Sequence, residues 1–336
     1  MSAALSVRGL RHSFGNFHAL TDVSFEVERG QVFGFIGPNG AGKTTTLRSI
    51  ATLHTPDAGA IDVCGVDVQS DPGSARRLIG YMPDHAGVYE RTTGTEFLEL
   101  FAGMQRIPVR RVDEVIELTG LRKVADRFVN ELSKGLRQRM QLARILLHDP
   151  ELLLLDEPAS DLDPRARIEL RELILELKRR GKTILLSSHI LTELADVCTH
   201  VGILEGGRMV AYGTIGDIAN QVQKARTPAS MQQNDAYRAN KNPDKRAARM
   251  RIIGDAEHAR AVLSKVSLVS DVIVSNLGHV SFAYAGDERT LGQAVKALVH
   301  ADVLVCSVHP EQDELERVFL EVTQGEALTG AERREK

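Results

Sequence analysis

The stretch GPNGAGKT at residues 37–44 restricts the possible folds of this chain more than any other feature. It matches the pattern G-x-x-x-x-G-K-[ST], follows the apolar stretch VFGFI and opens the helix-like stretch KTTTLRSIATL. Glycines in such a loop let backbone N–H groups surround phosphate oxygens, and the helix N-terminus adds positive potential. The motif predicts a nucleoside triphosphate site; the alternative is a glycine-rich turn without a ligand. The predicted nucleotide-binding residues are Gly37, Pro38, Asn39, Gly40, Ala41, Gly42, Lys43, Thr44 and Thr45.

A second motif, LLLLDEP, places two acidic residues directly after an apolar run. A continuous apolar run is typical of a parallel strand that is buried on both faces. Asp156 at its end is predicted to hold Mg²⁺ together with the hydroxyl of Thr44, and Glu157 to orient and deprotonate the attacking water. Two solvated acids at the end of a strand are the alternative. Together with the first motif, the acid pair predicts a nucleotide hydrolase.

Strands and helices alternate through the first two thirds of the chain. The stretch KTILLSSH is typical of another buried strand. Residues 164–181 are typical of a helix that starts at Pro164 and ends before Gly181. The stretch HVGILEGGRMVAYG is typical of a hairpin that turns at Gly206 and Gly207. This alternation predicts an α/β fold with a mostly parallel sheet.

The composition changes after about residue 224. Residues 225–248 are polar and lack an apolar period, which predicts a linker. Residues 249–325 show the order β-α-β-β-α-β followed by an amphipathic helix, DELERVFLEVT, and this order predicts a small ferredoxin-like α+β module. Residues 326–336 form a charged tail.

Composition excludes several classes of protein. The chain has 336 residues and a net charge of −3, so it lacks the basic footprint of a nucleic-acid binder. Its three scattered cysteines predict neither disulfides nor a zinc site. Neither a signal peptide nor an apolar run long enough to span a membrane is recognisable, which predicts a soluble chain that works at a membrane only through another protein.

The order of five motifs resembles an ABC ATPase subunit: the phosphate loop, LSKGLRQRM, LLLLDEP, SDLD and SSH, within about residues 5–214. The resemblance implies a P-loop ATPase domain over residues 1–224, with a mostly parallel sheet, an antiparallel β subdomain and a helical subdomain at about residues 86–147. It also implies ATP as the nucleotide, Mg²⁺ as the metal and a second ATPase subunit, identical or paralogous, as a partner.

The resemblance also assigns roles to single residues. LSKGLRQ resembles the signature motif LSGGQ, with Lys134 in place of the first glycine and Leu136 in place of the glutamine. In that family the signature motif contacts the ATP of the partner subunit. The implied signature residues are Ser133, Lys134 and Gly135, and the implied D-loop residues are Ser160, Asp161 and Asp163.

Three further positions follow from the same resemblance. His189 is similar to the switch histidine at the γ-phosphate, although a lone histidine is more often a buried structural residue. Phe14 occupies the position that stacks on adenine, with packing in a strand core as the alternative. Asp84 stands where the family has glutamine, and its carboxylate is a candidate Mg²⁺ ligand or a solvated loop acid.

The resemblance favours an ATPase subunit at the cytoplasmic face of the cell membrane, peripheral to a separate membrane-spanning permease. Two segments are similar to segments of ATPase subunits of ABC-2-type exporters and favour export: DELERVFLEVT and YERTTGTEFLELFA. A soluble ATPase acting on ribosomes or DNA, and a regulatory ATPase whose C-terminal module binds a ligand, are the alternatives. The sequence predicts neither the transported substrate nor the role of the C-terminal module.

Overall fold

The computed structural model describes residues 3–85, 87, 89, 91–189, 194, 197–214, 217–218, 245–275, 279–286 and 288–310. The described residues divide into two compact units, one within residues 1–221 and the other within residues 222–318. Each unit has its own hydrophobic core. Among the described residues, the helices are all too short or too polar to cross a bilayer.

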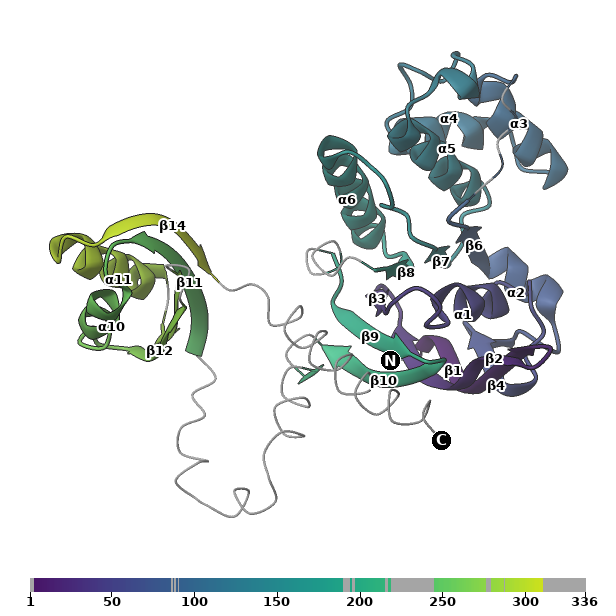
Figure 1. Ribbon diagram of the computed structural model, residues 1–336. Helices are drawn as coiled ribbons and strands as arrows, with labels where there is room; N and C mark the ends of the chain where they lie inside the picture. The colour runs from purple at the N-terminus through teal and green to yellow at the C-terminus, as the bar shows by residue number, and fades with distance from the viewer. Residues whose placement is uncertain are drawn as a thin grey trace. The chain divides into compact units, whose positions relative to one another are not determined.

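A ten-stranded sheet in the order β5-β4-β1-β2-β10-β9-β3-β8-β7-β6 organises the first unit (Figure 1). Strands β1, β2, β4 and β5 pair antiparallel, whereas β3, β6, β7 and β8 pair parallel, with β9 parallel to β3. The strands are β1 Ala3–Phe14, β2 Phe17–Glu28, β3 Val32–Ile36, β4 Ala58–Val63, β5 Val66–Asp67, β6 Ile79–Met82, β7 Leu152–Leu155, β8 Thr183–Ser188, β9 His200–Glu205 and β10 Arg208–Thr214.

The parallel strands lie at the centre of the core. Every residue of β3, β7 and β8 is buried, as the apolar runs predict for strands that are covered on both faces. Strands β9 and β10 form the predicted hairpin through Gly206 and Gly207. The carboxyl ends of β3, β8 and β7 therefore meet at one edge of the sheet, because these three strands are parallel neighbours.

The helices of the first unit are α1 Lys43–Ile50, α2 Pro72–Leu78, α3 Gly94–Met104, α4 Arg110–Leu118, the 3₁₀ turn η1 Val129–Glu131, α5 Lys134–Leu146 and α6 Pro164–Arg179. Helices α3, α4 and α5 group together beyond β6, where the helical subdomain was expected (Figure 1). On α3, Phe97 and Leu98 are fully buried and Met104 is 66% exposed, so its apolar stripe divides between core and surface.

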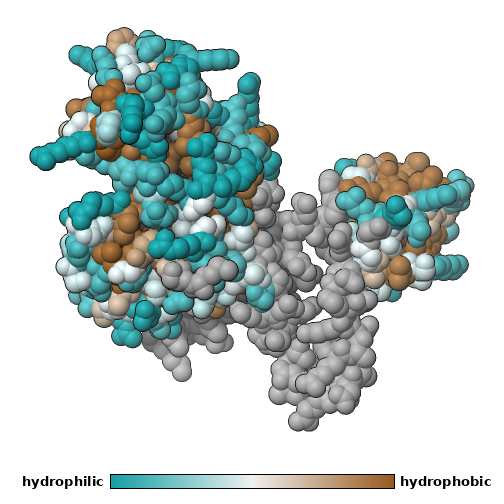
Figure 2. All heavy atoms as spheres, turned by 180° about the vertical axis from the view of Figure 1, so that it is seen from behind, coloured by the Kyte–Doolittle hydropathy of each residue, from teal (hydrophilic) through white to brown (hydrophobic). Residues whose placement is uncertain are grey.

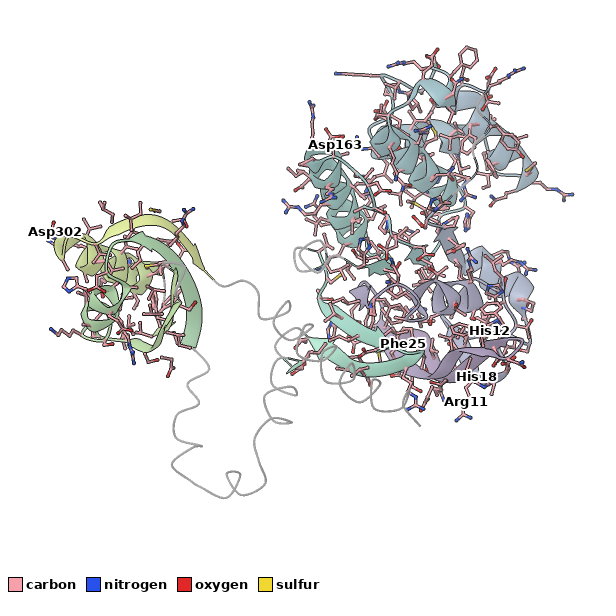
Figure 3. All side chains as sticks on the ribbon, viewed as in Figure 1. Arg11, His12, His18, Phe25, Asp163 and Asp302 are labelled. Atoms are coloured by element: carbon pink, nitrogen blue, oxygen red, sulfur yellow. The ribbon has the colours of Figure 1, made fainter. Side chains whose placement is uncertain are left out.

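Side-chain caps determine where several helices begin. Thr93 and Glu96 form a reciprocal capping box at the start of α3. Ser133 caps α5, and Asp163 caps α6 by accepting from the Ala166 N–H at 2.9 Å (Figure 3). Helix α5 therefore begins directly after Ser133.

The second unit is a four-stranded antiparallel sheet in the order β12-β13-β11-β14. Its elements are β11 Lys245–Ile253, α10 Ala256–Leu263, β12 Val269–Ser275, β13 His279–Ala285, α11 Glu288–His300 and β14 Leu304–Pro310. The element order is βαββαβ, and α10 and α11 contribute Leu263, Leu291 and Leu298 to the core. Apolar side chains also reach the surface of this unit, among them Ile273, Val299 and Leu304 (Figure 2).

Strand β11 starts at Lys245, inside the stretch predicted as linker up to residue 248. The polar composition of this stretch suggested a linker. In the structure, however, its residues pair with β13 from Lys245, opposite Ala285, and this backbone pairing extends the strand. Three predicted segments lie outside the described residues: the linker at residues 225–244, the helix at residues 313–323 and the tail at residues 326–336.

Candidate active site

The loop between β3 and α1 carries the phosphate-binding motif. Lys43 is 7% exposed, and its Nζ donates to the carbonyl oxygens of Gly37 at 2.6 Å and Pro38 at 3.3 Å. Gly42 occupies the N-cap of α1 with φ of 104°, and an added Cβ would lie 2.6 Å from Leu20 Cδ2. Glycine is therefore required where the loop turns into the helix. Helix α1 begins directly after the loop, and the first N–H groups of a helix lack intrahelical partners and suit an anion.

Asp156 lies at the end of β7 and is 1% exposed. Its Oδ1 accepts from Thr44 Oγ1 at 3.1 Å and from Ser187 Oγ at 2.7 Å, while its Oδ2 is buried without a hydrogen-bond partner among the described residues. Burial raises the pKa of Asp156, and the negative charges of Asp84 and Glu157 raise it further. The hydrogen bonds from Ser187 and Thr44 lower it, but burial has the larger effect. A buried carboxylate oxygen beside a threonine hydroxyl suits a hard divalent cation.

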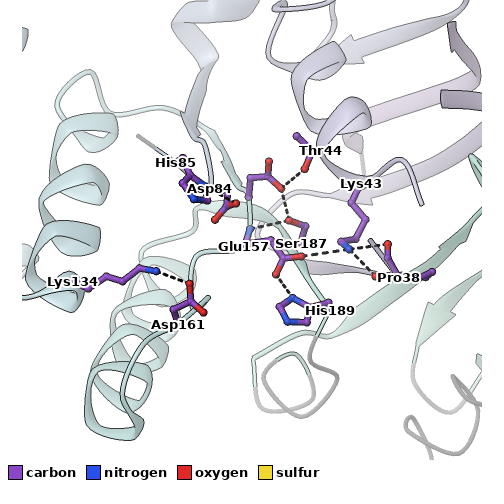
Figure 4. Close-up of polar contacts among 12 residues, drawn as sticks. Pro38, Lys43, Thr44, Asp84, His85, Lys134, Glu157, Asp161, Ser187 and His189 are labelled. Atoms are coloured by element: carbon purple, nitrogen blue, oxygen red, sulfur yellow. Dashed lines mark hydrogen bonds and ion pairs between the residues drawn. The ribbon is translucent and has the colours of Figure 1, made fainter. Parts of the chain in front are cut away.

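Glu157 follows in a left-handed conformation, with φ of 48°. Its N–H donates to Ser187 Oγ at 2.9 Å, its Oε1 lies 3.4 Å from Lys43 Nζ, and its Oε2 lies 2.9 Å from His189 Nδ1 (Figure 4). Non-glycine residues rarely adopt this conformation, and it persists only when surrounding contacts hold it. Those contacts leave the carboxylate between a lysine and a histidine, where it can accept a proton from water.

Ser187 is a residue of the candidate site that was not predicted from the sequence. Its hydroxyl donates to Asp156 and accepts from the Glu157 N–H, so it joins both acids to β8. The available signal was a hydroxyl inside the buried stretch TILLSS, because a buried polar side chain needs a partner. His189 is 46% exposed and bonded to Glu157, so it is not the buried structural histidine of the alternative interpretation.

Two of the signature residues, Lys134 and Gly135, contact the D-loop and α6 of the same chain. Lys134 Nζ donates to Asp161 Oδ2 at 3.0 Å (Figure 4). The Ser160 N–H donates to the carbonyl oxygen of Glu157 at 3.1 Å. An added Cβ on Gly135 would lie 2.7 Å from the Cβ of Ala166, so α5 and α6 approach closely at this level. Predicted contacts with a partner's ATP stay a prediction.

Replacing Gly135 by Ala is expected to lower the free energy of unfolding by about 1–3 kcal/mol, because the new methyl group overpacks against Ala166. Thermal or urea unfolding of G135A, A166G and the double variant measures this. The cost of G135A should nearly vanish in the A166G background. Equal destabilisation in both backgrounds would contradict a packing requirement between α5 and α6.

Phe14 lies at the end of β1 and is 48% exposed, which contradicts packing in a strand core. Its ring meets His12 edge to face, with centroids 4.6 Å apart. Residues Ala19 and Leu20 of the paired strand β2 border Gly42, so the tip of this hairpin lies near the phosphate loop. The predicted stacking of adenine on Phe14 is compatible with this position and stays a prediction.

Asp84 is half-exposed, and His85 Nδ1 lies 2.7 Å from its Oδ2. The negative charge of Asp84 adds to the raised pKa of Asp156. Replacing Asp84 by Gln is expected to preserve hydrolysis but raise the Mg²⁺ concentration for half-maximal rate about threefold, because one negative charge is lost. A Mg²⁺ titration of ATPase activity measures this, with Glu99→Gln on α3 as the exposed control. An unchanged rate and Mg²⁺ response would refute a role for Asp84.

Comparisons with known proteins relate this chain to ABC transporters. Residues 20–160 match the sequence model of the family described as "ABC transporter". The chain is 32% identical over 337 residues to the daunorubicin resistance ATP-binding protein DrrA3 of Streptomyces coeruleorubidus, with 99% of this chain and 98% of that protein covered. It is 38% identical over 213 residues to the Nod factor export ATP-binding protein I of Ralstonia nicotianae, covering 62% of this chain and 66% of that protein.

A solved structure described as the ATP-binding subunit of an ABC transporter superposes with a TM-score of 0.60 and 33% identity, over 68% of this chain and 96% of that chain. Fold and site together define a P-loop ATPase of the ABC type. The chain belongs to the family of ABC transporter ATP-binding proteins. The fold class and the ATP-hydrolysing transporter subunit predicted from the sequence are confirmed.

Proposed function

We propose that this chain powers an exporter by closing, with a second ATPase subunit, over two ATP molecules at the cytoplasmic face of the membrane. One observation carries the proposal. Five side chains converge at the carboxyl ends of the neighbouring parallel strands β3, β8 and β7. They are those of Lys43, Asp156, Glu157, Ser187 and His189. A nucleotide held by the phosphate loop would have its terminal phosphate within this cluster.

Each side chain has a distinct role in the proposed hydrolysis. Lys43 exchanges the carbonyl oxygens of its own loop for phosphate oxygens. Glu157 accepts a proton from the attacking water, and His189 fixes the orientation of that carboxylate. Ser187 keeps Asp156 and Glu157 in register with β8.

Thr44 and Asp156 are the residues that would hold Mg²⁺. The buried Oδ2 of Asp156 suits a cation, and the described residues contain no cluster of three or more His, Cys, Asp or Glu side chains that would form a metal site without the nucleotide. Bound Mg²⁺ would neutralise charge on the phosphate oxygens. The two protein ligands leave the remaining positions to phosphate and water.

The direction of transport is proposed from the relatives. Their names describe Nod factor export and daunorubicin resistance, and resistance by a transporter subunit implies removal of an organic solute from the cell. The sequence DELERVFLEVT, similar to the ends of ABC-2-type exporter subunits, supports the same direction. The proposed partners are a membrane-spanning permease and a second ATPase subunit, either another copy or a paralogue.

Reconstitution tests the proposal. The chain is co-purified with a membrane-spanning protein encoded next to it, and ATPase activity and solute efflux from vesicles are measured. Stimulated hydrolysis and ATP-dependent efflux are expected, and Glu157→Gln should abolish efflux while the complex stays intact. Glu151→Gln, at the opposite end of β7, is the control. An active ATPase that associates with no membrane protein, or that drives uptake, would refute the exporter function.

A further inference from the structure

Arg144 is a half-buried cation on helix α5, which packs against both strand β6 and helix α3. Its Nε donates to Gln141 Oε1 at 2.7 Å and its Nη2 to the carbonyl oxygen of Tyr81 at 3.4 Å, and its guanidinium carbon lies 5.3 Å from the centre of the Phe101 ring. Burial lowers the pKa of Arg144, because it disfavours the charged form. A guanidinium stays charged in a protein, so these three neutral groups must replace the water that it has lost.

The three elements that Arg144 joins are packed closely. An added Cβ on Gly80 of β6 would lie 3.0 Å from the carbonyl oxygen of Ile145, so α5 approaches the backbone of this strand. On α3, the Phe101 ring packs against the fully buried Phe97, with ring centroids 5.0 Å apart. The guanidinium therefore has one contact in the core of the helical subdomain and another on the backbone of the ten-stranded sheet.

Strand β6 connects this contact with the acid pair. It pairs parallel with β7, with Tyr81 opposite Leu154. One residue beyond Tyr81, the carbonyl oxygen of Met82 accepts from the Asp156 N–H at 2.9 Å. Burial, and after it the negative charge of Asp156, raises the pKa of Tyr81. A shift of β6 relative to β7 would therefore move the backbone of Asp156, the first acid of the pair.

We propose that Arg144 is a positioning residue for ATP hydrolysis, because it ties α3 to β6 and thereby holds the backbone of Asp156 in place. The inference rests on the proposed hydrolysis at this site. A guanidinium can donate from its edge and contact an aromatic ring at the same time, whereas an ammonium group is a compact point charge. None of the described contacts of Arg144 is with the phosphate loop, so its loss should leave nucleotide binding intact.

The first test separates kcat from KM for ATP in the full chain. R144M should lower kcat about tenfold, the size expected when a charged donor loses its hydrogen bonds, while KM changes less than about twofold. F101L keeps an apolar side chain but removes the ring, and it should lower kcat about threefold. Because both variants break the same link, the double variant should resemble R144M alone.

A second measurement does not depend on activity. Amide hydrogen exchange of the nucleotide-free chain should become faster in R144M at residues 79–82 and at Asp156, because the bond from the Asp156 N–H to Met82 opens more often. F101L should change the same amides. This variant keeps the charge in place and serves as the test if R144M does not fold.

R111M is the matched control. Arg111 on α4 donates to the carbonyl oxygens of Leu146 and Leu147 at the end of α5, and none of its described bonds reaches β6. Its loss should lower the melting temperature but leave kcat and the exchange of Asp156 unchanged.

The outcomes separate the two proposals. Unchanged kcat in R144M or F101L, losses that multiply in the double variant, or an equal loss of kcat in R111M would overturn the positioning role, while ATP hydrolysis itself stands. An unmodified chain that does not hydrolyse ATP would refute the proposed function, and this inference would fail with it.

Discussion

Replacing Glu157 by Gln should lower ATP hydrolysis at least about a hundredfold while ATP still binds, because an amide cannot accept the proton of the attacking water. The substitution keeps the shape of the side chain and the N–H bond from residue 157 to Ser187. Single-turnover hydrolysis measures the chemical step, and fluorescent ATP measures binding. With ATP present, the variant should elute from a sizing column as a stable dimer.

Glu151→Gln is the matched control, because Glu151 precedes β7 at the opposite end of the strand, exposed and paired with Arg29. It should hydrolyse ATP like the unmodified chain. Retention of more than about a tenth of the activity in Glu157→Gln would show that another group deprotonates the water.

Replacing Lys43 by Ala should weaken ATP binding itself. A hydrogen bond to a charged group contributes about 1.5–3 kcal/mol, so the affinity should fall about ten- to a hundredfold. Titration calorimetry measures this, with exposed Lys123→Ala as the control. Unfolding must be measured in parallel, because Lys43 also bonds two loop carbonyls. If the affinity for ATP is unchanged but hydrolysis is lost, Lys43 stabilises only the transition state and not bound ATP.

The sequence predicted those parts of the fold whose patterns are local. The apolar runs before Asp156 and around residues 183–188 became β7 and β8, since full burial on both faces leaves an unbroken run. Strands β4 and β5 and helix α2 were not assigned. Half of β4 is exposed and α2 has seven residues, so neither has a strong apolar period. Asp71 and Pro72, the N-cap and first residue of α2, were the available signal.

The same distinction applies to the site. The phosphate loop and the acid pair are contiguous motifs, so their residues could be named in advance. The bonds of Ser187 to Asp156 and of Lys134 to Asp161 join positions 31 and 27 residues apart, and the close packing of Gly135 on Ala166 spans a similar interval. The pairing order of the sheet and the packing of α5 on α6 determine which side chains meet across such intervals. Neither can be predicted from a local sequence pattern.

The neighbours of β3 determine when the chain acquires its nucleotide site during synthesis. Both strands that pair with β3, β8 and β9, lie beyond residue 182, although the phosphate loop follows β3 directly. A nascent chain that ends before residue 183 has no partner for β3, and its phosphate loop cannot be anchored against β8. Contacts of such long sequence separation form late and slowly. The nucleotide site is therefore expected to form only after β8 and β9 have been synthesised, so retention of ATP by truncated chains would report the pairing of β3.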